Sequence, residues 1–213
     1  MSELINFKDF NIASVAALTL YDGRQFGLCY EHIPYVKFST PPMVAPFPIS
    51  EFTNNDRKTY SLSLAFNGIG NNCDLESMKQ LFEALDDLII ELAIKHCSSW
   101  FKKSLTRQQI QKMYKPILKP SNNPAKYPPS IRIKLKQTDG QITSRVFYVK
   151  TNGTTSNFEL NDFTPGSKVS VYLKLSNIWF MNDTFGVSLE GEDIFVHEPK
   201  MEVGFKYTFV EDE

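Results

Sequence analysis

The chain has 213 residues, enough for one large domain or two small ones with a buried core. Its apolar content of 42% and aromatic content of 13% exclude a disordered chain and favour a folded globular protein. The formal net charge of −1 hides an uneven distribution. Residues 92–138 carry eleven Lys or Arg residues and neither Asp nor Glu, whereas each flank holds six basic and twelve acidic residues.

This acid-free segment favours a polyanionic partner, and nucleic acid is the commonest such partner. The alternative is a solvated basic face that binds nothing. The three cysteines are odd in number and widely spaced, which argues against a disulfide framework and favours a reducing compartment. No apolar run is long enough to cross a bilayer, and the N-terminus lacks a signal-peptide pattern, so we expect an intracellular protein without a membrane partner.

The first third of the chain is predicted to be rich in β-strands. Apolar stretches at 12–21 and 26–38 are separated by the turn signal Asp22-Gly23. Four prolines between positions 41 and 48 remove amide donors, so this stretch is predicted to be an extended loop or an edge, not a central strand. Tyr60–Phe66 alternates apolar and small polar residues, which is typical of a half-buried strand.

Two helices are predicted next. Asp74 is placed to cap a helix that runs to about Cys97, with apolar residues every three or four positions. Thr106 starts a shorter helix through about Tyr114, and Gln109 is placed for a capping box. A proline-rich connector follows, and the chain then returns to strands at 131–136, 142–150, 168–180 and 185–196, with a hairpin turn at 138–141.

The strand at 131–136 carries the clearest local signal. Its period of two places Arg132, Lys134 and Lys136 on one face, about 6.6 Å apart. That spacing resembles the phosphate repeat of an extended single strand, and Lys126 and Tyr127 lie just upstream. The alternative is an exposed face or an edge that lysines protect against aggregation.

The later strands supply candidate base-stacking residues. Tyr172 and Lys174 share the polar face of their strand, and an aromatic ring beside a cation suits stacking plus phosphate contact. Trp179 is a further candidate, with a core position as the alternative. Phe147 and Tyr148 must point to opposite faces; alternation does not decide between them, and Tyr148 is taken as the candidate.

The helical segment adds Lys102, Lys103 and Arg107, which either extend a groove or form a solvated helix face. Signals for an enzyme are weak, because the three histidines are scattered and no metal motif, phosphate loop or nucleophile elbow occurs. We therefore expect no catalytic residues, no metal site and no cofactor.

Two motifs resemble a known family. They are Lys126-Tyr-Pro-Pro-x-Ile-Arg-Ile-Lys-Leu135, and Gly166-Ser-x-Val169 followed by Ile178-Trp-Phe-(x)4-Phe-Gly-Val187. Over about residues 125–197 the chain resembles the OB-fold single-stranded-DNA-binding proteins of nucleocytoplasmic large DNA viruses, which are similar to phage-type replicative binding proteins. The resemblance implies a basic and aromatic groove that coats displaced strands. The family often ends in an acidic tail, and the Glu-Asp-Glu end of this chain is short.

The fold expected from these observations is mainly β (α+β), an OB-type antiparallel β-barrel with a helical insertion. The expected organisation is a single domain, 1–213, with a β-rich part at 1–73, the insertion at 74–118, the connector at 119–130 and an antiparallel β part at 131–213.

The expected function is largely sequence-independent binding of single-stranded DNA, protecting displaced strands in replication, recombination or repair. The expected phosphate contacts are Lys126, Arg132, Lys134, Lys136 and Lys174, extended by Lys102, Lys103 and Arg107, and the stacking residues are Tyr127, Tyr148, Tyr172 and Trp179. Replication proteins and a second copy of the chain are the further partners considered, in a host cytoplasm (viral factory) or nucleus. The alternatives are RNA binding through the same groove and a viral assembly adaptor whose basic segment docks an acidic protein.

Overall fold

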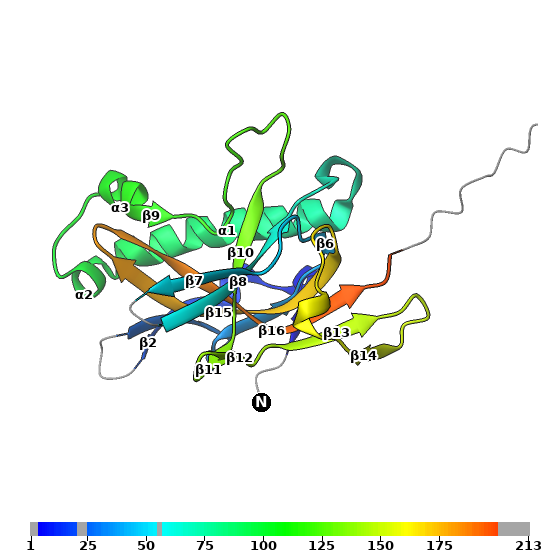
Figure 1. The fold of residues 1–213 in the computed structure, drawn as a ribbon. Coiled ribbons are helices and arrows are strands. Elements are labelled where there is room, and N and C mark those ends of the chain that lie inside the picture. Colours follow the sequence, from blue (N-terminus) through cyan, green and yellow to red (C-terminus); the bar gives the residue numbers. More distant parts are fainter. Residues whose placement is uncertain (1–3, 21–24, 55–56, 200–213) are drawn as a thin grey trace, which may run out of the picture.

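The computed structural model describes residues 4–20, 25–54 and 57–199. Strands form a closed barrel, and one long helix lies along one side of it (Figure 1). The helices are α1 (Cys73–Lys95), α2 (Cys97–Phe101) and α3 (Arg107–Met113). The strands are β1 (Ile5–Asn6), β2 (Val15–Leu20), β3 (Gln25–Tyr30), β4 (Ile33–Pro34), β5 (Val36–Ser39), β6 (Met43–Val44), β7 (Ser50–Asn54), β8 (Arg57–Ala65), β9 (Tyr114–Lys115), β10 (Ser130–Leu135), β11 (Gln137–Thr138), β12 (Gln141–Ile142), β13 (Arg145–Val149), β14 (Thr155–Asn157), β15 (Lys168–Met181) and β16 (Thr184–His197). The predicted turn at Asp22-Gly23 and the acidic end at 211–213 lie outside the described residues.

Strand pairing closes the barrel in the order expected of an OB fold. The first barrel strand consists of β5 and β6 in succession. β6 pairs antiparallel with β8, and β8 pairs antiparallel with β10. β15 pairs antiparallel with β16 and with both β5 and β6. β10 and β16 pair in parallel and close the ring. When the five barrel strands are numbered along the chain, their order around the ring is 1-2-3-5-4-1. The expected OB-type barrel with a helical insertion is therefore confirmed, although one closing pair is parallel.

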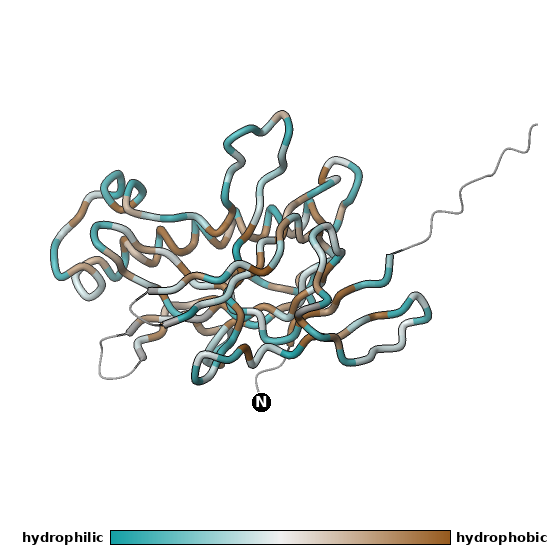
Figure 2. The backbone as a smooth tube through the Cα atoms, viewed as in Figure 1, coloured by the Kyte–Doolittle hydropathy of each residue, from teal (hydrophilic) through white to brown (hydrophobic). Residues whose placement is uncertain are grey.

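The core lies inside this barrel and under α1. Alternation along β10 buries Ile131, Ile133 and Leu135, and β15 buries Val169, Val171, Leu173 and Leu175 in the same way. The apolar stripe of α1 packs against them, with Phe82 in contact with the rings of Phe38 and Phe66. Figure 2 shows that hydrophobic residues gather near the centre of the molecule and that hydrophilic residues occupy the projecting loops.

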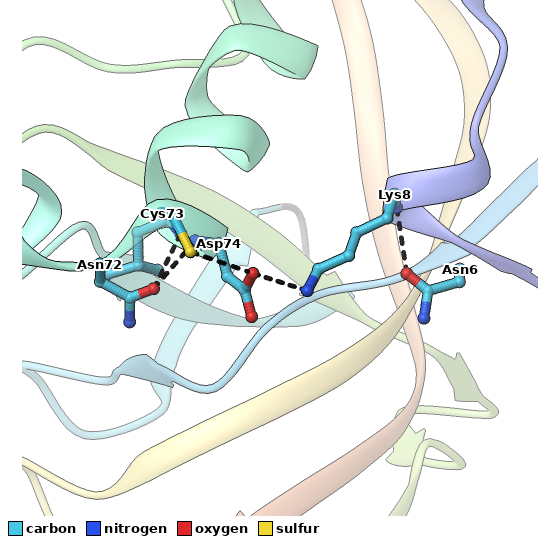
Figure 3. A network of polar contacts seen from close by, with 6 residues as sticks. Asn6, Lys8, Asn72, Cys73 and Asp74 are labelled. Carbon is cyan, nitrogen blue, oxygen red and sulfur yellow. Dashed lines mark hydrogen bonds and ion pairs between the residues drawn. The ribbon is translucent and has the colours of Figure 1, made fainter.

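The N-terminus of α1 is held by a polar network that differs from the predicted cap (Figure 3). The side-chain oxygen of Asn72, not Asp74, accepts the backbone N–H groups of Asp74 and Leu75, at 3.0 and 3.3 Å. Asp74 lies in the first turn and pairs with Lys8 at 2.7 Å, which ties the N-terminal segment to the helix. The prediction of an Asp74 cap is therefore wrong by two residues. The chain turns at His96, which separates α1 from α2.

The predicted capping box of α3 is confirmed: the Thr106 side chain accepts from the Gln109 backbone, and Gln109 accepts from the Thr106 N–H. After α3 the chain is fastened to α1 by Asp86. Its carboxylate accepts hydrogen bonds from the Tyr114 hydroxyl at 2.5 Å and the Ile117 N–H at 2.9 Å. These two hydrogen bonds hold the segment between α3 and β10 against α1.

Asp86 gives a testable dependence of stability on pH. Burial raises the pKa of its carboxyl above the ordinary value, so the folded protein binds this proton more tightly than the unfolded chain. Its contribution is therefore largest at low pH and is lost as pH rises through the folded pKa. We expect the stability of the wild type relative to Asp86→Asn to decrease as pH rises above the ordinary carboxyl pKa of about 4. Urea unfolding across this range measures it, and a pH-independent difference would contradict the assignment.

Two other expectations were wrong in detail. Met43 and Val44 form β6, which lies between β15 and β8, because the four prolines flank these two residues and remove none of their hydrogen bonds. The hairpin turn at 138–141 is present, but it joins only β11 and β12, and 142–150 does not return beside β10. The buried Ser144 hydroxyl donates to the Gly191 carbonyl and accepts from the Lys136 N–H, so the chain turns toward β16, where β13 pairs in parallel.

Candidate nucleic-acid interface

The candidate interface is the outer face of the barrel, defined as the side of the strands opposite the buried core residues. On β10 this face carries Arg132 and Lys134, both exposed, and the exposed Lys136 follows directly. The predicted alternation is therefore present. β8 and β10 are the second and third strands of the barrel, and the face of these two strands is where OB folds bind oligonucleotides.

Cross-strand register places the outer-face residues of neighbouring strands in one row. Lys134 lies opposite Ser61 on β8 and opposite Glu190 on β16, and Glu190 lies opposite Lys174 on β15. The acids on this face are matched by cations of their own. Lys174 pairs with Glu190 at 3.9 Å, Lys37 with Glu192 at 2.8 Å, and Arg145 with Asp193 at 2.6 Å.

The cations of β10 are different, because their partners are neutral. Arg132 Nε donates to the Ser61 hydroxyl at 3.0 Å, and Lys134 Nζ donates to the Ser188 hydroxyl at 3.2 Å. Within the described part of the chain, no carboxylate forms an ion pair with Arg132, Lys134 or Lys136. Hydroxyl groups orient these side chains without neutralising them, so the positive charge remains available to an anion.

A fourth cation joins this group. Lys119 pairs with Ser130 at the start of β10. Ser130 lies on the same face of β10 as Arg132, two residues along, so the two cations are neighbours. Partial burial lowers the pKa of the Lys119 ammonium, and the nearby charge of Arg132 lowers it further. Lys119, Arg132, Lys134 and Lys136 are called the cationic lane below. The lane thus brings Lys119 next to the cations at 132–136, from which it is separated in the sequence by the proline-rich connector.

Exposed aromatic rings lie at both ends of the lane. Tyr127, in the loop before β10, is 54% exposed, and the Lys126 ammonium lies 5.1 Å from the centre of its ring. Phe52 on β7 is 60% exposed and lies opposite Thr59, which places it on the same face of β8 as Ser61. The sequence analysis did not select Phe52. The available signal was an aromatic residue flanked by polar residues beside a strand that faces solvent.

Replacing Phe52 tests its place in the interface. If Phe52 stacks on a base, Phe52→Ala is expected to weaken binding of single-stranded DNA by about 5- to 100-fold. Phe47 provides a matched control, because it lies in the same connection between β6 and β8 and is 61% exposed. Fluorescence anisotropy with a labelled oligonucleotide measures both variants. Equal affinities for Phe52→Ala and Phe47→Ala would remove Phe52 from the interface.

Trp179 lies on the outer face and not in the core. It pairs with Gly186, and a Cβ atom on Gly186 would lie 2.6 Å from the indole Cζ2, so the ring covers this glycine. Lys115 on β9 lies opposite Gly186 on its other side. The indole is half-buried, so part of its surface remains open to a stacking partner.

The other predicted stacking and phosphate residues divide between the two faces. Tyr172 and Lys174 lie on the outer face, where Tyr172 contacts Phe195 and the Lys174 ammonium lies 4.0 Å from the centre of the Tyr35 ring. Tyr148 points to the core side and stacks on Phe158 at 5.9 Å. Phe147, its neighbour, takes the outer position instead. The choice of Tyr148 over Phe147 therefore does not match the geometry of the outer face.

The predicted extension by the helical segment is not brought to the lane. Lys102 and Lys103 follow α2, which lies with α3 at one end of the barrel, apart from β10 (Figure 1). Arg107 forms an ion pair with Glu91 of α1. The basic residues of this segment therefore occupy two regions, the lane and the end of the barrel.

Residues 4–20, 25–54 and 57–199 contain neither a metal-binding cluster nor a membrane-spanning helix. No group of three or more His, Cys, Asp or Glu side chains there could hold a metal ion. No helix there is long and apolar enough to span a membrane.

The fold and the outer face define an OB-type barrel with a basic, aromatic surface. The chain belongs to a family of unknown function, DUF5871, which residues 67–211 match. No curated protein matches it.

Two solved phage structures are similar to the chain. Gp2.5, a single-stranded DNA binding protein of bacteriophage T7, is 13% identical with a TM-score of 0.47, covering 83% of this chain and 98% of that one. The single-stranded DNA-binding protein of bacteriophage Enc34, in complex with single-stranded DNA, is 13% identical with a TM-score of 0.45, covering 84% and 93%.

Proposed function

We propose that this protein binds single-stranded DNA, largely without sequence preference, along the outer face of its barrel. The observation that carries the proposal is the cationic lane, where four cations without an acidic partner in the described residues follow the strands that OB folds use for oligonucleotides. Cations that track a backbone, with exposed rings for the bases, are the usual means of holding a single strand. Since every base has a π-face, such an interface tolerates any sequence.

The proposal includes a role in protecting displaced strands during replication, recombination or repair, by a binding protein and not an enzyme. It also includes membership of the viral single-stranded-DNA-binding family that the two motifs resemble. The setting proposed with it is intracellular, in a host cytoplasm (viral factory) or nucleus. Association with replication proteins or with a second copy of the chain belongs to the same proposal.

Anisotropy with labelled oligonucleotides tests the proposed function. The probes are a single DNA strand of about thirty nucleotides, longer than the site of one OB fold, its duplex, and an RNA strand of the same sequence. The proposal predicts tight binding to the single DNA strand, weaker binding to the duplex, and affinity that falls as salt increases. Preference for RNA would favour ribose contacts in the same groove. Absence of binding at low salt would overturn the proposal and direct the search to an acidic protein partner.

A further inference from the structure

A second group of outer-face residues lies beyond the cationic lane, at the other end of β16. Phe195 on β16 has Phe147 of β13 beside it, with ring centres 5.4 Å apart and planes 21° apart. Tyr172 of β15 contacts the same ring at 4.7 Å. The three rings are half-buried, and none belongs to the core cluster formed by the described residues. Three adjacent strands thus present a continuous row of aromatic surface.

An oriented cation lies at the edge of this row. Arg145 donates two hydrogen bonds to Asp193, at 2.7 Å from Nε and 2.6 Å from Nη2. The Asp193 side chain is almost buried, whereas that of Arg145 is 71% exposed and its guanidinium lies 5.8 Å from the centre of the Phe147 ring. A guanidinium has five N–H donors, so this pairing fixes its plane and leaves donors directed to solvent. Such a group suits a phosphate placed beside stacked bases.

The distance from the lane sets how long a strand must be to reach these rings. Glu190, opposite Lys134 of the lane, and Phe195 are five residues apart on β16, which corresponds to about 16 Å. Stacked nucleotides advance about 3.4 Å each along a strand, so the separation equals about five nucleotides. An oligonucleotide shorter than this cannot occupy both places at once while its bases remain stacked.

We propose that Arg145, Phe147, Tyr172 and Phe195 form a second nucleotide subsite, here called the aromatic subsite, which holds bases on its rings and a phosphate on Arg145. This inference rests on the proposed function and extends it, because it sets the site size of one protein molecule. A strand of about four nucleotides occupies the lane alone, and a strand of about twelve occupies the lane and the aromatic subsite.

The test compares oligothymidylates of about four and about twelve nucleotides on the full chain, within the usual site sizes of OB folds. Phe147→Leu with Phe195→Leu keeps apolar cover over the sheet and removes the two stacking rings. We expect the double variant to bind the twelve-mer about 5- to 100-fold more weakly than the wild type, with unchanged binding of the four-mer. Phe47→Leu, at an exposed phenylalanine elsewhere, is expected to bind both as the wild type does.

The outcomes separate the two claims. If the wild type binds neither oligonucleotide nor longer single strands, the proposed function and the aromatic subsite both fail. If the wild type binds and the double variant loses affinity for neither or for both lengths alike, only the subsite is overturned. Circular dichroism checks the fold of each variant. Should the double variant not fold, Tyr172→Leu removes one ring, and the same selective loss with the twelve-mer is required of it.

Discussion

Replacing Arg132, Lys134 and Lys136 together with glutamine is expected to weaken binding of single-stranded DNA by about 100-fold or more, while the fold remains intact. The three side chains are exposed, and Arg132 and Lys134 donate to the hydroxyl groups of Ser61 and Ser188, so their removal leaves no carboxylate of the described residues unpaired. Each cation that neutralises a phosphate releases counterions. The slope of log affinity against log salt should therefore fall in magnitude by about two, at about 0.7 per phosphate lost.

A second triple variant separates the lane from the general positive charge of the segment. Lys95, Lys102 and Lys103 belong to the same acid-free segment but lie at the end of α1 and after α2, away from β10. Their replacement with glutamine removes the same charge. Anisotropy titrations at several salt concentrations compare the two variants, with thermal melting as a check on folding. Equal losses of affinity in both would show that net charge, and not the lane, governs binding.

The second large effect concerns stability. Phe82→Ala is expected to lower the free energy of unfolding by about 3–5 kcal/mol, because the ring is 0% exposed and its removal leaves a cavity. Phe82 joins α1 to the barrel through Phe38 of β5 and through Phe66 just after β8, at 6.1 and 6.4 Å between ring centres. For a chain of this size the loss corresponds to a decrease in melting temperature of about 6–20 °C.

Phe47→Ala is the matched control, since it removes the same side chain from a position that is 61% exposed. Its stability is expected to remain within about 0.5 kcal/mol of the wild type. Chemical denaturation followed by circular dichroism measures both variants. A loss below about 1 kcal/mol for Phe82→Ala would show that α1 is not anchored to the barrel by this ring.

Several elements were predictable because their signals are local. The alternation of β10 follows from its own side chains, and it assigned Ile131 and Ile133 to the core and Arg132 and Lys134 to the outer face. The capping box of α3 depends on Thr106 and Gln109, three residues apart. The long helix α1 follows from an apolar stripe within one segment, although its cap was misplaced because Asn72 and Asp74 are both good capping residues.

Other features depend on partners that are distant in the sequence. Met43 and Val44 become a barrel strand only because β15 and β8 lie on either side of them. The chain leaves β12 for β16 because Ser144 bonds to Gly191, 47 residues later. Trp179 lies on the outer face because Gly186 offers a flat backbone beneath the indole. Each outcome is set by a pairing between strands, which periodicity within one segment does not encode.

The sequence alone determined the class of fold, the helices and the acid-free segment, because hydrophobic periodicity and charge are properties of consecutive residues. Only the tertiary structure decided which cations remain without an acidic partner. Lys174, Lys37 and Arg145 form ion pairs with acids of β16, whereas Arg132 and Lys134 of β10 donate to the hydroxyl groups of Ser61 and Ser188. It also decided that Phe147, and not Tyr148, joins Phe195 and Tyr172 in one row. The physical reason is cross-strand register, which brings together side chains distant in the chain, such as Arg132 and Ser61, 71 residues apart.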